Sequence, residues 1–317
     1  MDYIPLPDGA VRQSIDSITI FDEFSRSREA ARPYAGGMYW KRQGEYEYLV
    51  KTSPDNRQRR IGPRSSETEK IYQDFCAGKA AAEGRLKSLR VALTDAERLN
   101  KALKVGRVPA AVISVLQAID EAGLGRHFAV VGTHALYAYE TAAGVRIVPG
   151  ALATQDVDLL WDARQRVQFV TDLGRTQTSV LGVLQRADAS FERKAGHPET
   201  AINARGFEVD FLRRQPEQED PHPFRFSDDE ADLWPIQAVR AGVLTSAPRF
   251  HQPVIGTTGR MALMRTIAPA AFAEFKRWMA GAAPAREQAK RRRDARQAQI
   301  VQSLIDEGLL IQAPAAQ

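Results

Sequence analysis

The sequence predicts an α+β fold, in which a small mixed sheet with helices on one side is flanked by an amino-terminal helical and hairpin region and by a carboxy-terminal helical region. One observation is the apolar run Phe128–Val131, which leads through Gly132 into a helical pattern over 134–142. The others are two segments, 156–160 and 207–212, in which polar and apolar residues alternate. The predicted core is therefore a buried strand that turns into a helix, followed by two half-buried strands.

Residues 1–104 form the predicted amino-terminal region. Helices are expected over 17–32 and 67–104, the second with a new start at Thr94-Asp95. Alternating runs predict a hairpin and a third short strand, over 38–43, 46–51 and 59–63. This hairpin is basic and carries Tyr and Trp side chains, which either stack on nucleic-acid bases or pack the hairpin onto a neighbouring element.

Residues 105–262 form the predicted core, and residues 263–317 form the carboxy-terminal helical region. Besides its strands, the core is expected to contain helices over 109–122, 164–173 and 178–185, a loop rich in Pro, Asp and Glu over 215–232, and an edge element over 254–256. Helices are expected to follow over 263–278 and 286–307.

Asp156 and Asp158 are separated by one residue, so on a strand both carboxylates point to the same face. Asp210 lies on the polar side of the later strand and joins them if the two strands are neighbours. Carboxylates gathered in this way repel one another unless they bind a divalent ion such as Mg²⁺ or Mn²⁺, which prefers oxygen ligands. Three carboxylates can hold two metals for an in-line phosphoryl displacement. The alternative for any Asp-x-Asp pair is a solvated turn.

These residues also resemble a known signature. Gly132-Thr133, Asp156-Val-Asp158 and Asp210 are similar to the signature of the DNA polymerase β-like nucleotidyltransferase superfamily. A wider resemblance, over about residues 105–300, is to a bacterial group of nucleotidyltransferase-fold proteins of largely undefined function; it is carried by Phe128–Glu140, Ala153–Trp161 and Ala271–Trp278. Two features depart from the superfamily pattern: residues 134–155 make a longer spacing before the first aspartate, and Thr133 stands where serine is usual.

The resemblance implies a polymerase β-like core and the transfer of a nucleoside monophosphate from an NTP to an acceptor hydroxyl. It does not identify the acceptor, for which RNA, tRNA and a protein are the candidates. It implies that Asp156, Asp158 and Asp210 are catalytic metal ligands, and that Gly132, Thr133 and Lys276 bind the nucleotide. For Lys276, the alternative is a surface lysine whose stem packs on apolar neighbours.

Asp294 resembles a Lys-Asp element of abortive-infection-type nucleotidyltransferase toxins, although charge pairing along its helix is an equal explanation. A toxin that acts with an antitoxin partner is therefore one possible identity. A different class of function is a non-catalytic module that keeps the nucleotidyltransferase fold and binds nucleic acid or a partner.

Positive charge is concentrated in one segment of the chain. The net charge is +5, yet residues 276–296 carry eight basic and two acidic residues, a local charge of +6, so the rest of the chain sums to −1. Such a field attracts a triphosphate or nucleic acid. Lys290, Arg291, Arg292 and Arg293 are the candidate nucleic-acid contacts, and a solvated helix surface is the alternative.

Composition excludes several classes of protein. The 317 residues are 44% hydrophobic, which is ordinary for a globular chain and unlike a disordered one. We expect no membrane span and no secretory leader, because apolar runs are short and the first residues lack a basic segment. A single cysteine, Cys76, excludes an internal disulfide and a cysteine-rich zinc site, so we expect a cytoplasmic protein.

Overall fold

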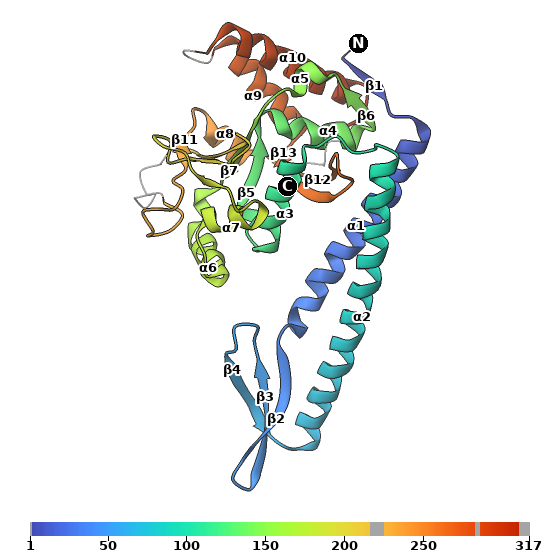
Figure 1. Cartoon of the computed structure of the whole chain (residues 1–317), viewed down its shortest axis with the longest axis vertical. Helices are drawn as coiled ribbons and strands as arrows, with labels where there is room; N and C mark the ends of the chain where they lie inside the picture. The colour runs from blue at the N-terminus through green and yellow to red at the C-terminus, as the bar shows by residue number, and fades with distance from the viewer. Residues whose placement is uncertain (1, 216–224, 283–285, 311–317) are drawn as a thin grey trace. The chain divides into compact units, whose positions relative to one another are not determined.

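The computed structural model describes residues 2–215, 225–282 and 286–310 (Figure 1). The chain divides into two compact units: unit 1 comprises Met1–Arg12 and Asn100–Gln317, and unit 2 comprises Gln13–Leu99. The predicted α+β fold class is confirmed. Within the described residues, no helix is both long and apolar enough to cross a membrane. Much of the predicted loop over 215–232, namely residues 216–224, lies outside the described part.

Unit 2 combines a pair of long helices with a small antiparallel sheet. Its elements are most of α1 (Asp8–Ala31), the short helix η1 (Arg32–Tyr34), β2 (Gly37–Gln43), β3 (Tyr46–Thr52), β4 (Gln58–Pro63) and most of α2 (Ser66–Ala102). The sheet has the order β2-β3-β4, so the predicted hairpin and third strand are present. Helices α1 and α2 lie side by side and antiparallel (Figure 1), and Arg85 of α2 contacts Glu23 and Ser27 of α1.

The predicted helix start at Thr94-Asp95 is wrong, because α2 continues through these residues. The Thr94 hydroxyl donates to the carbonyl of Arg90, four residues earlier and 2.9 Å away, and so it does not cap a new helix. The first helix also begins earlier than predicted, at Asp8, which lies in its first turn where a negative charge is favourable.

Unit 1 contains the predicted core and the carboxy-terminal helices. Its helices are α3 (Ala110–Glu121), α4 (Leu136–Ala143), α5 (Pro149–Leu152), α6 (Arg166–Thr176), α7 (Val180–Ala187), α8 (Ala241–Ser246), α9 (Pro269–Gly281) and α10 (Gln288–Asp306), with short turns η2 (Gly125–His127), η3 (Gly132–Ala135) and η4 (Ala163–Gln165). Its strands are β1 (Tyr3–Pro5), β5 (Phe128–Val131), β6 (Val145–Ile147), β7 (Asp156–Trp161), β8 (Glu192–Arg193), β9 (Thr200–Ile202), β10 (Glu208–Arg213), β11 (Ile236–Gln237), β12 (Arg249–Ile255) and β13 (Met261–Ile267).

The central sheet is mixed and has the order β5-β7-β10-β9-β8, with β11 also paired to β10. Strands β7 and β10 are parallel, whereas β5 runs antiparallel to β7 and β9 runs antiparallel to β10. The long spacing over residues 134–155 is filled by α4, β6 and α5. Strand β6 pairs with the amino-terminal strand β1, outside the central sheet.

Helices lie on both faces of this sheet, whereas one covered face is predicted. Val157, Leu159 and Trp161 point to one face, where Trp161 and Phe128 pack against Phe169 of α6 with ring centroids 5.3 and 5.8 Å apart. Helix α9 lies over the other face, the face that carries the aspartates. The half-buried acidic residues therefore lie on the sheet face that looks toward this helix.

The helix predicted over 263–278 and the edge element predicted over 254–256 are also corrected. Residues up to Ile267 form β13, which pairs antiparallel with the longer strand β12, and the helix α9 begins only at Pro269. Met, Ala and Leu favour a helix locally, but burial against β12 and β5 favours a strand here. The Thr266 hydroxyl, for example, donates to the carbonyl of Val130 at 2.7 Å. Proline suits the first turn of the helix that follows.

Candidate active site

Three aspartates meet on the face of the sheet that looks toward α9. In the parallel pairing of β7 with β10, Asp158 lies opposite Asp210, and Asp156 lies opposite Glu208. Ligand oxygens of Asp156, Asp158 and Asp210 all lie within 4.8 Å of one another. The two strands therefore bring together the carboxylates that the period-2 pattern predicts.

Burial and mutual repulsion disfavour the negatively charged form of the aspartates in this cluster. Burial, followed by repulsion from Asp156 and Asp210, raises the pKa of Asp158 to about 7, although Lys276 and Arg286 act in the other direction. Burial also raises the pKa of Asp210, against a 2.5 Å hydrogen bond from the Thr200 hydroxyl. A cation held among these oxygens would relieve the repulsion.

Gly132 is required by the tight turn between β5 and η3. Its φ is +68°, a left-handed conformation that favours glycine, and a Cβ atom here would collide with Asp158 Oδ2. The backbone of this turn thus lies directly against the acidic cluster. Thr133 is buried, and its hydroxyl accepts a 3.1 Å hydrogen bond from Gln297 of α10. Thr133 consequently ties the turn to the carboxy-terminal helix.

Lys276 is buried rather than at the surface, and Asp294 is its partner. Lys276 Nζ lies 2.8 Å from Asp294 Oδ1, and Arg286 Nε donates to Asp294 Oδ2 at 2.7 Å. Burial lowers the pKa of Lys276, and the charge of Asp294 offsets this effect only in part. The pairing joins α9 to α10, so charge pairing along one helix is not the explanation of Asp294. We call Lys276, Arg286 and Asp294 the cationic clamp.

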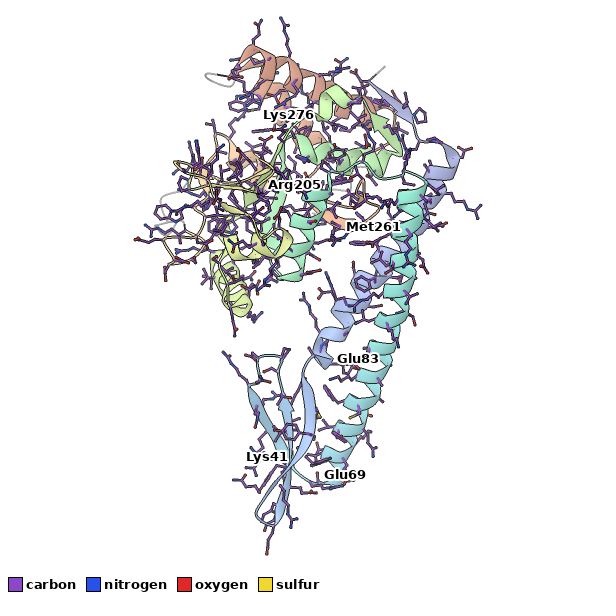
Figure 2. The ribbon with its side chains drawn as sticks, in the orientation of Figure 1. Lys41, Glu69, Glu83, Arg205, Met261 and Lys276 are labelled. Carbon is purple, nitrogen blue, oxygen red and sulfur yellow. The ribbon has the colours of Figure 1, made fainter. Side chains whose placement is uncertain are left out.

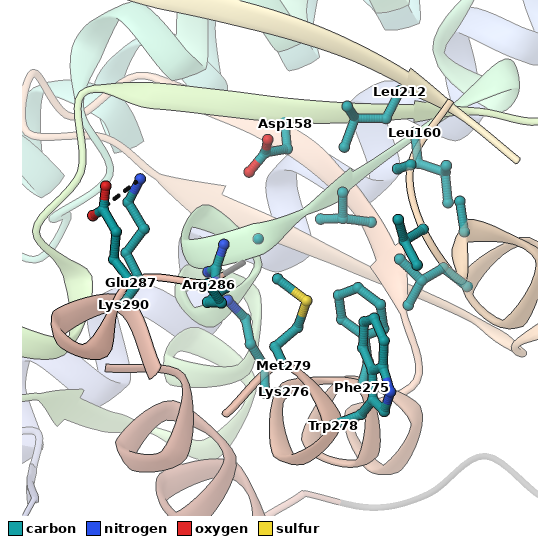
Figure 3. A pocket seen from close by; sticks show the side chains of 16 residues that line it. Asp158, Leu160, Leu212, Phe275, Lys276, Trp278, Met279, Arg286, Glu287 and Lys290 are labelled. Atoms are coloured by element: carbon teal, nitrogen blue, oxygen red, sulfur yellow. Dashed lines mark ion pairs between the residues drawn. The ribbon is translucent and has the colours of Figure 1, made fainter. Parts of the chain in front are cut away.

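A pocket of about 420 Å³ is lined both by Lys276 and Arg286 of the clamp and by Asp158 of the acidic cluster (Figure 3). Asp158, Lys276 and Arg286 line its polar part. Its apolar part continues along the same face of the strands, where Leu160 and Leu212 follow Asp158 and Asp210 by two residues. This part is completed from α8, α9 and the preceding loop by Ala238, Val239, Ala241, Leu244, Phe275, Trp278 and Met279. The pocket therefore offers charge at one end and an aromatic and aliphatic wall at the other.

The four residues predicted to contact nucleic acid divide into two kinds. Lys290 and Arg292 are exposed, and Lys290 lies 3.6 Å from Glu287, also exposed, in an ion pair marked in Figure 3. Arg291 donates to the carbonyls of Ala280 and Gly281, and Arg293 donates to the carbonyl of Ala153. Arg291 and Arg293 thus hold the backbone, which leaves Lys290 and Arg292 as the more accessible charges.

The sequence profile of a nucleotidyltransferase family matches residues 110–315. The chain belongs to this nucleotidyltransferase family. Searches of curated proteins and of solved structures returned no match. The matched segment contains all three aspartates, the Gly132 turn and the clamp, so the family assignment and the site geometry concern the same residues.

Several residues of the site were not singled out in the sequence. Arg286 was counted only as part of the basic segment, and Gln297 carries no sequence signal. Phe275 and Trp278 lie three residues apart, the spacing of one helix face, which could have indicated a shared apolar surface. The sequence does not show that this surface faces Leu160 of β7 and Leu212 of β10 across the pocket.

Proposed function

We propose that this protein transfers a nucleoside monophosphate from an NTP to an acceptor hydroxyl. The observation that carries the proposal is the cluster of Asp156, Asp158 and Asp210, one member of which, Asp158, lines a pocket together with Lys276 and Arg286 of the cationic clamp. Negative ligands for a metal and positive groups for a triphosphate stand side by side, which is the combination that phosphoryl transfer needs.

The residues present fit a divalent cation such as Mg²⁺ or Mn²⁺. The donor set consists of carboxylate oxygens, which these hard ions prefer. Within the described residues, no Lys or Arg side chain forms an ion pair with any of the three carboxylates, so their charge is left for another cation. When bound, the ion supplies charge neutralisation at the attacking and leaving oxygens.

The other residues have roles that follow from their positions. Lys276 and Arg286 contact the triphosphate, and Asp294 orients both of them. The Gly132 turn lets phosphate oxygens approach the backbone, with Thr133 behind it. Asp210 helps to activate the acceptor hydroxyl, because its carboxylate lies among the oxygens that would hold the metal ion. The base of the nucleotide lies on the apolar wall, where Phe275 and Trp278 offer stacking surfaces.

The acceptor belongs to one of two classes, RNA such as tRNA or a protein. Incubation of the purified chain with each labelled NTP, Mg²⁺ or Mn²⁺, and either total cellular RNA or total protein identifies it. We expect label in one macromolecular fraction, and none with the Asp156→Ala/Asp158→Ala variant. A chain that binds NTP with Mn²⁺ yet labels neither fraction would instead be a binding module. A toxin would in addition arrest growth when expressed, unless an antitoxin partner is supplied.

A further inference from the structure

The sheet formed by β2, β3 and β4 has two chemically different faces. Residues that pair across antiparallel strands share a face, and residues alternate between faces along each strand. Trp40 pairs with Leu49 on the face that packs against α2. There the Trp40 ring lies 5.9 Å from that of Tyr72, and Lys51 Nζ lies 5.4 Å from the centre of the Phe75 ring. We call this the helix face.

The opposite face, which we call the tyrosine face, carries Tyr39, Lys41, Tyr46, Tyr48 and Arg60. Tyr46 is 65% exposed and Tyr39 is 37% exposed. The guanidinium carbon of Arg60 lies 3.0 Å from the centre of the Tyr48 ring, and the Tyr46 and Tyr48 rings are 6.5 Å apart. Figure 2 shows Lys41 on this sheet. Aromatic and cationic side chains therefore form one surface.

The charges of the sheet are distributed unequally. Residues 37–64 contain seven basic and three acidic residues, a net charge of +4. Glu47 pairs across the strands with Arg42 on the helix face, and its carboxylate binds Arg64 at 2.5 Å. Glu45 and Asp55 lie in turns rather than in strands. The tyrosine face thus presents positive charge and aromatic rings without a strand carboxylate.

We propose that the tyrosine face binds single-stranded nucleic acid. Lys41 and Arg60 contact phosphates, and the exposed rings of Tyr39 and Tyr46 stack on unpaired bases, as aromatic platforms in cationic surfaces do. An acidic protein would engage only the cations, whereas an unpaired nucleic-acid strand offers both phosphates for the cations and bases for the exposed rings. The face lies outside residues 110–315, the segment matched by the family profile. The proposal concerns binding and stands whether or not nucleotide transfer occurs.

Adjacent arginines on opposite faces provide the test. Arg59 pairs with Lys51 on the helix face, whereas Arg60 pairs with Val50 on the tyrosine face, and both are exposed. Binding of a labelled single-stranded RNA to the full chain is measured by fluorescence anisotropy, with EDTA and without NTP. Arg60→Ala should weaken binding and lower the slope of log K against log salt by about 0.7, the value for one lost phosphate contact on a single strand. Arg59→Ala, with the same change in charge, should leave the slope unchanged.

A second pair of variants tests stacking. Tyr46→Leu keeps an apolar side chain but loses the ring, and should weaken RNA binding by roughly five- to 150-fold. Tyr46→Phe should bind as the wild type does. Because Tyr46 is exposed, both variants should keep the wild-type melting temperature. Equal slopes for the two arginine variants, an unchanged affinity of Tyr46→Leu, or a preference of the chain for polyglutamate or duplex RNA over single-stranded RNA would each overturn the proposal.

Discussion

Asp158 couples the site to the stability of the fold through its protonation. Its folded pKa of about 7 lies above the ordinary value of 3.8, because burial and the two neighbouring acids disfavour its charge. Between these pH values the folded state binds more protons than the unfolded state, so stability falls as pH rises. In EDTA, we expect the free energy of unfolding to fall by about 1–3 kcal/mol from pH 4 to pH 7 through this group. Thermal melting of wild type and Asp158→Asn measures the difference, and the variant should lack this decrease.

The same experiment has a metal arm. Mn²⁺ added above pH 7 should raise the melting temperature of the wild type, because an ion that binds only the folded state stabilises it by mass action. It should leave Asp158→Asn less affected and the Asp156→Ala/Asp158→Ala variant unaffected. Calorimetry should detect Mn²⁺ binding to the wild type and none to the double variant. Equal binding by both proteins would remove the metal assignment.

The contacts of Asp294 with Lys276 and Arg286 define its role. If it is replaced by alanine, Lys276 is left as an uncompensated buried charge, which typically costs about 3–5 kcal/mol. Lys276→Met removes the charge instead, and Asp294 keeps Arg286, so this variant should be less destabilised. Urea unfolding of the two variants provides the measurement. A smaller loss of stability in Asp294→Ala than in Lys276→Met would contradict the proposed clamp.

In the turn between β5 and α4, Gly132 leaves room for the carboxylate of Asp158. Gly132 and Gly144 both have left-handed backbone conformations, with φ of +68° and +65°, but only Gly132 lies against Asp158, since no atom lies within 4 Å of a Cβ at Gly144. Each Gly→Ala change should cost about 1–2 kcal/mol for the backbone conformation. Gly132→Ala should in addition weaken Mn²⁺ binding, because Asp158 must move. Calorimetry with Mn²⁺ distinguishes Gly132→Ala from Gly144→Ala. Equal metal affinity in the two variants would contradict the position of Gly132 against a metal-binding Asp158.

The basic residues of α10 should have two different effects when they are replaced, depending on whether their side chains are exposed or bound to backbone carbonyls. Lys290→Ala/Arg292→Ala removes exposed charges, and should reduce the salt slope of RNA binding by about 1.4 if both side chains contact phosphates. Arg291→Ala/Arg293→Ala removes hydrogen bonds to backbone carbonyls, and should lower the melting temperature. Anisotropy titrations and thermal melting provide the two readouts. The opposite assignment of effects would show that the half-buried pair, Arg291 and Arg293, is the binding pair.

The elements that could be predicted from the sequence are those whose signal is local. Period-2 alternation predicts β7 and β10 and places Asp156, Asp158 and Asp210 on their polar faces. The carboxylates meet because the two strands are parallel neighbours in register, which the sequence left as a condition and the structure shows. The clamp could not be predicted in this way, since Lys276 and Asp294 are 18 residues apart on different helices. The sequence of β13 predicts a helix, whereas pairing with β12 makes it a strand. Its residues alone favour the wrong period.

In the whole chain, the proposed nucleotide site and the proposed nucleic-acid surface belong to separate units. Nucleotide binding concerns residues of unit 1, all between Gly132 and Asp294, whereas the tyrosine face belongs to unit 2. The sequence indicates nucleotide binding and nucleic-acid binding but does not assign each to its own unit. Basic residues occur in both units, and charge alone does not identify a ligand. Stacking surfaces distinguish them: Phe275 and Trp278 line a pocket, and Tyr39 and Tyr46 are exposed on a sheet.

This separation predicts two different patterns of hydrogen exchange. A bound ligand slows exchange where opening requires its release, because binding stabilises the closed state by about 2.7 kcal/mol at a free concentration of 100 times Kd. NTP with Mn²⁺ should therefore protect β7, β10 and α9 and leave β2, β3 and β4 unchanged. Single-stranded RNA without NTP should protect the β2–β4 sheet, and this protection should vanish in Tyr46→Leu but survive in Asp156→Ala/Asp158→Ala. Protection of β2, β3 and β4 by NTP alone would mean that the two units respond to one ligand together.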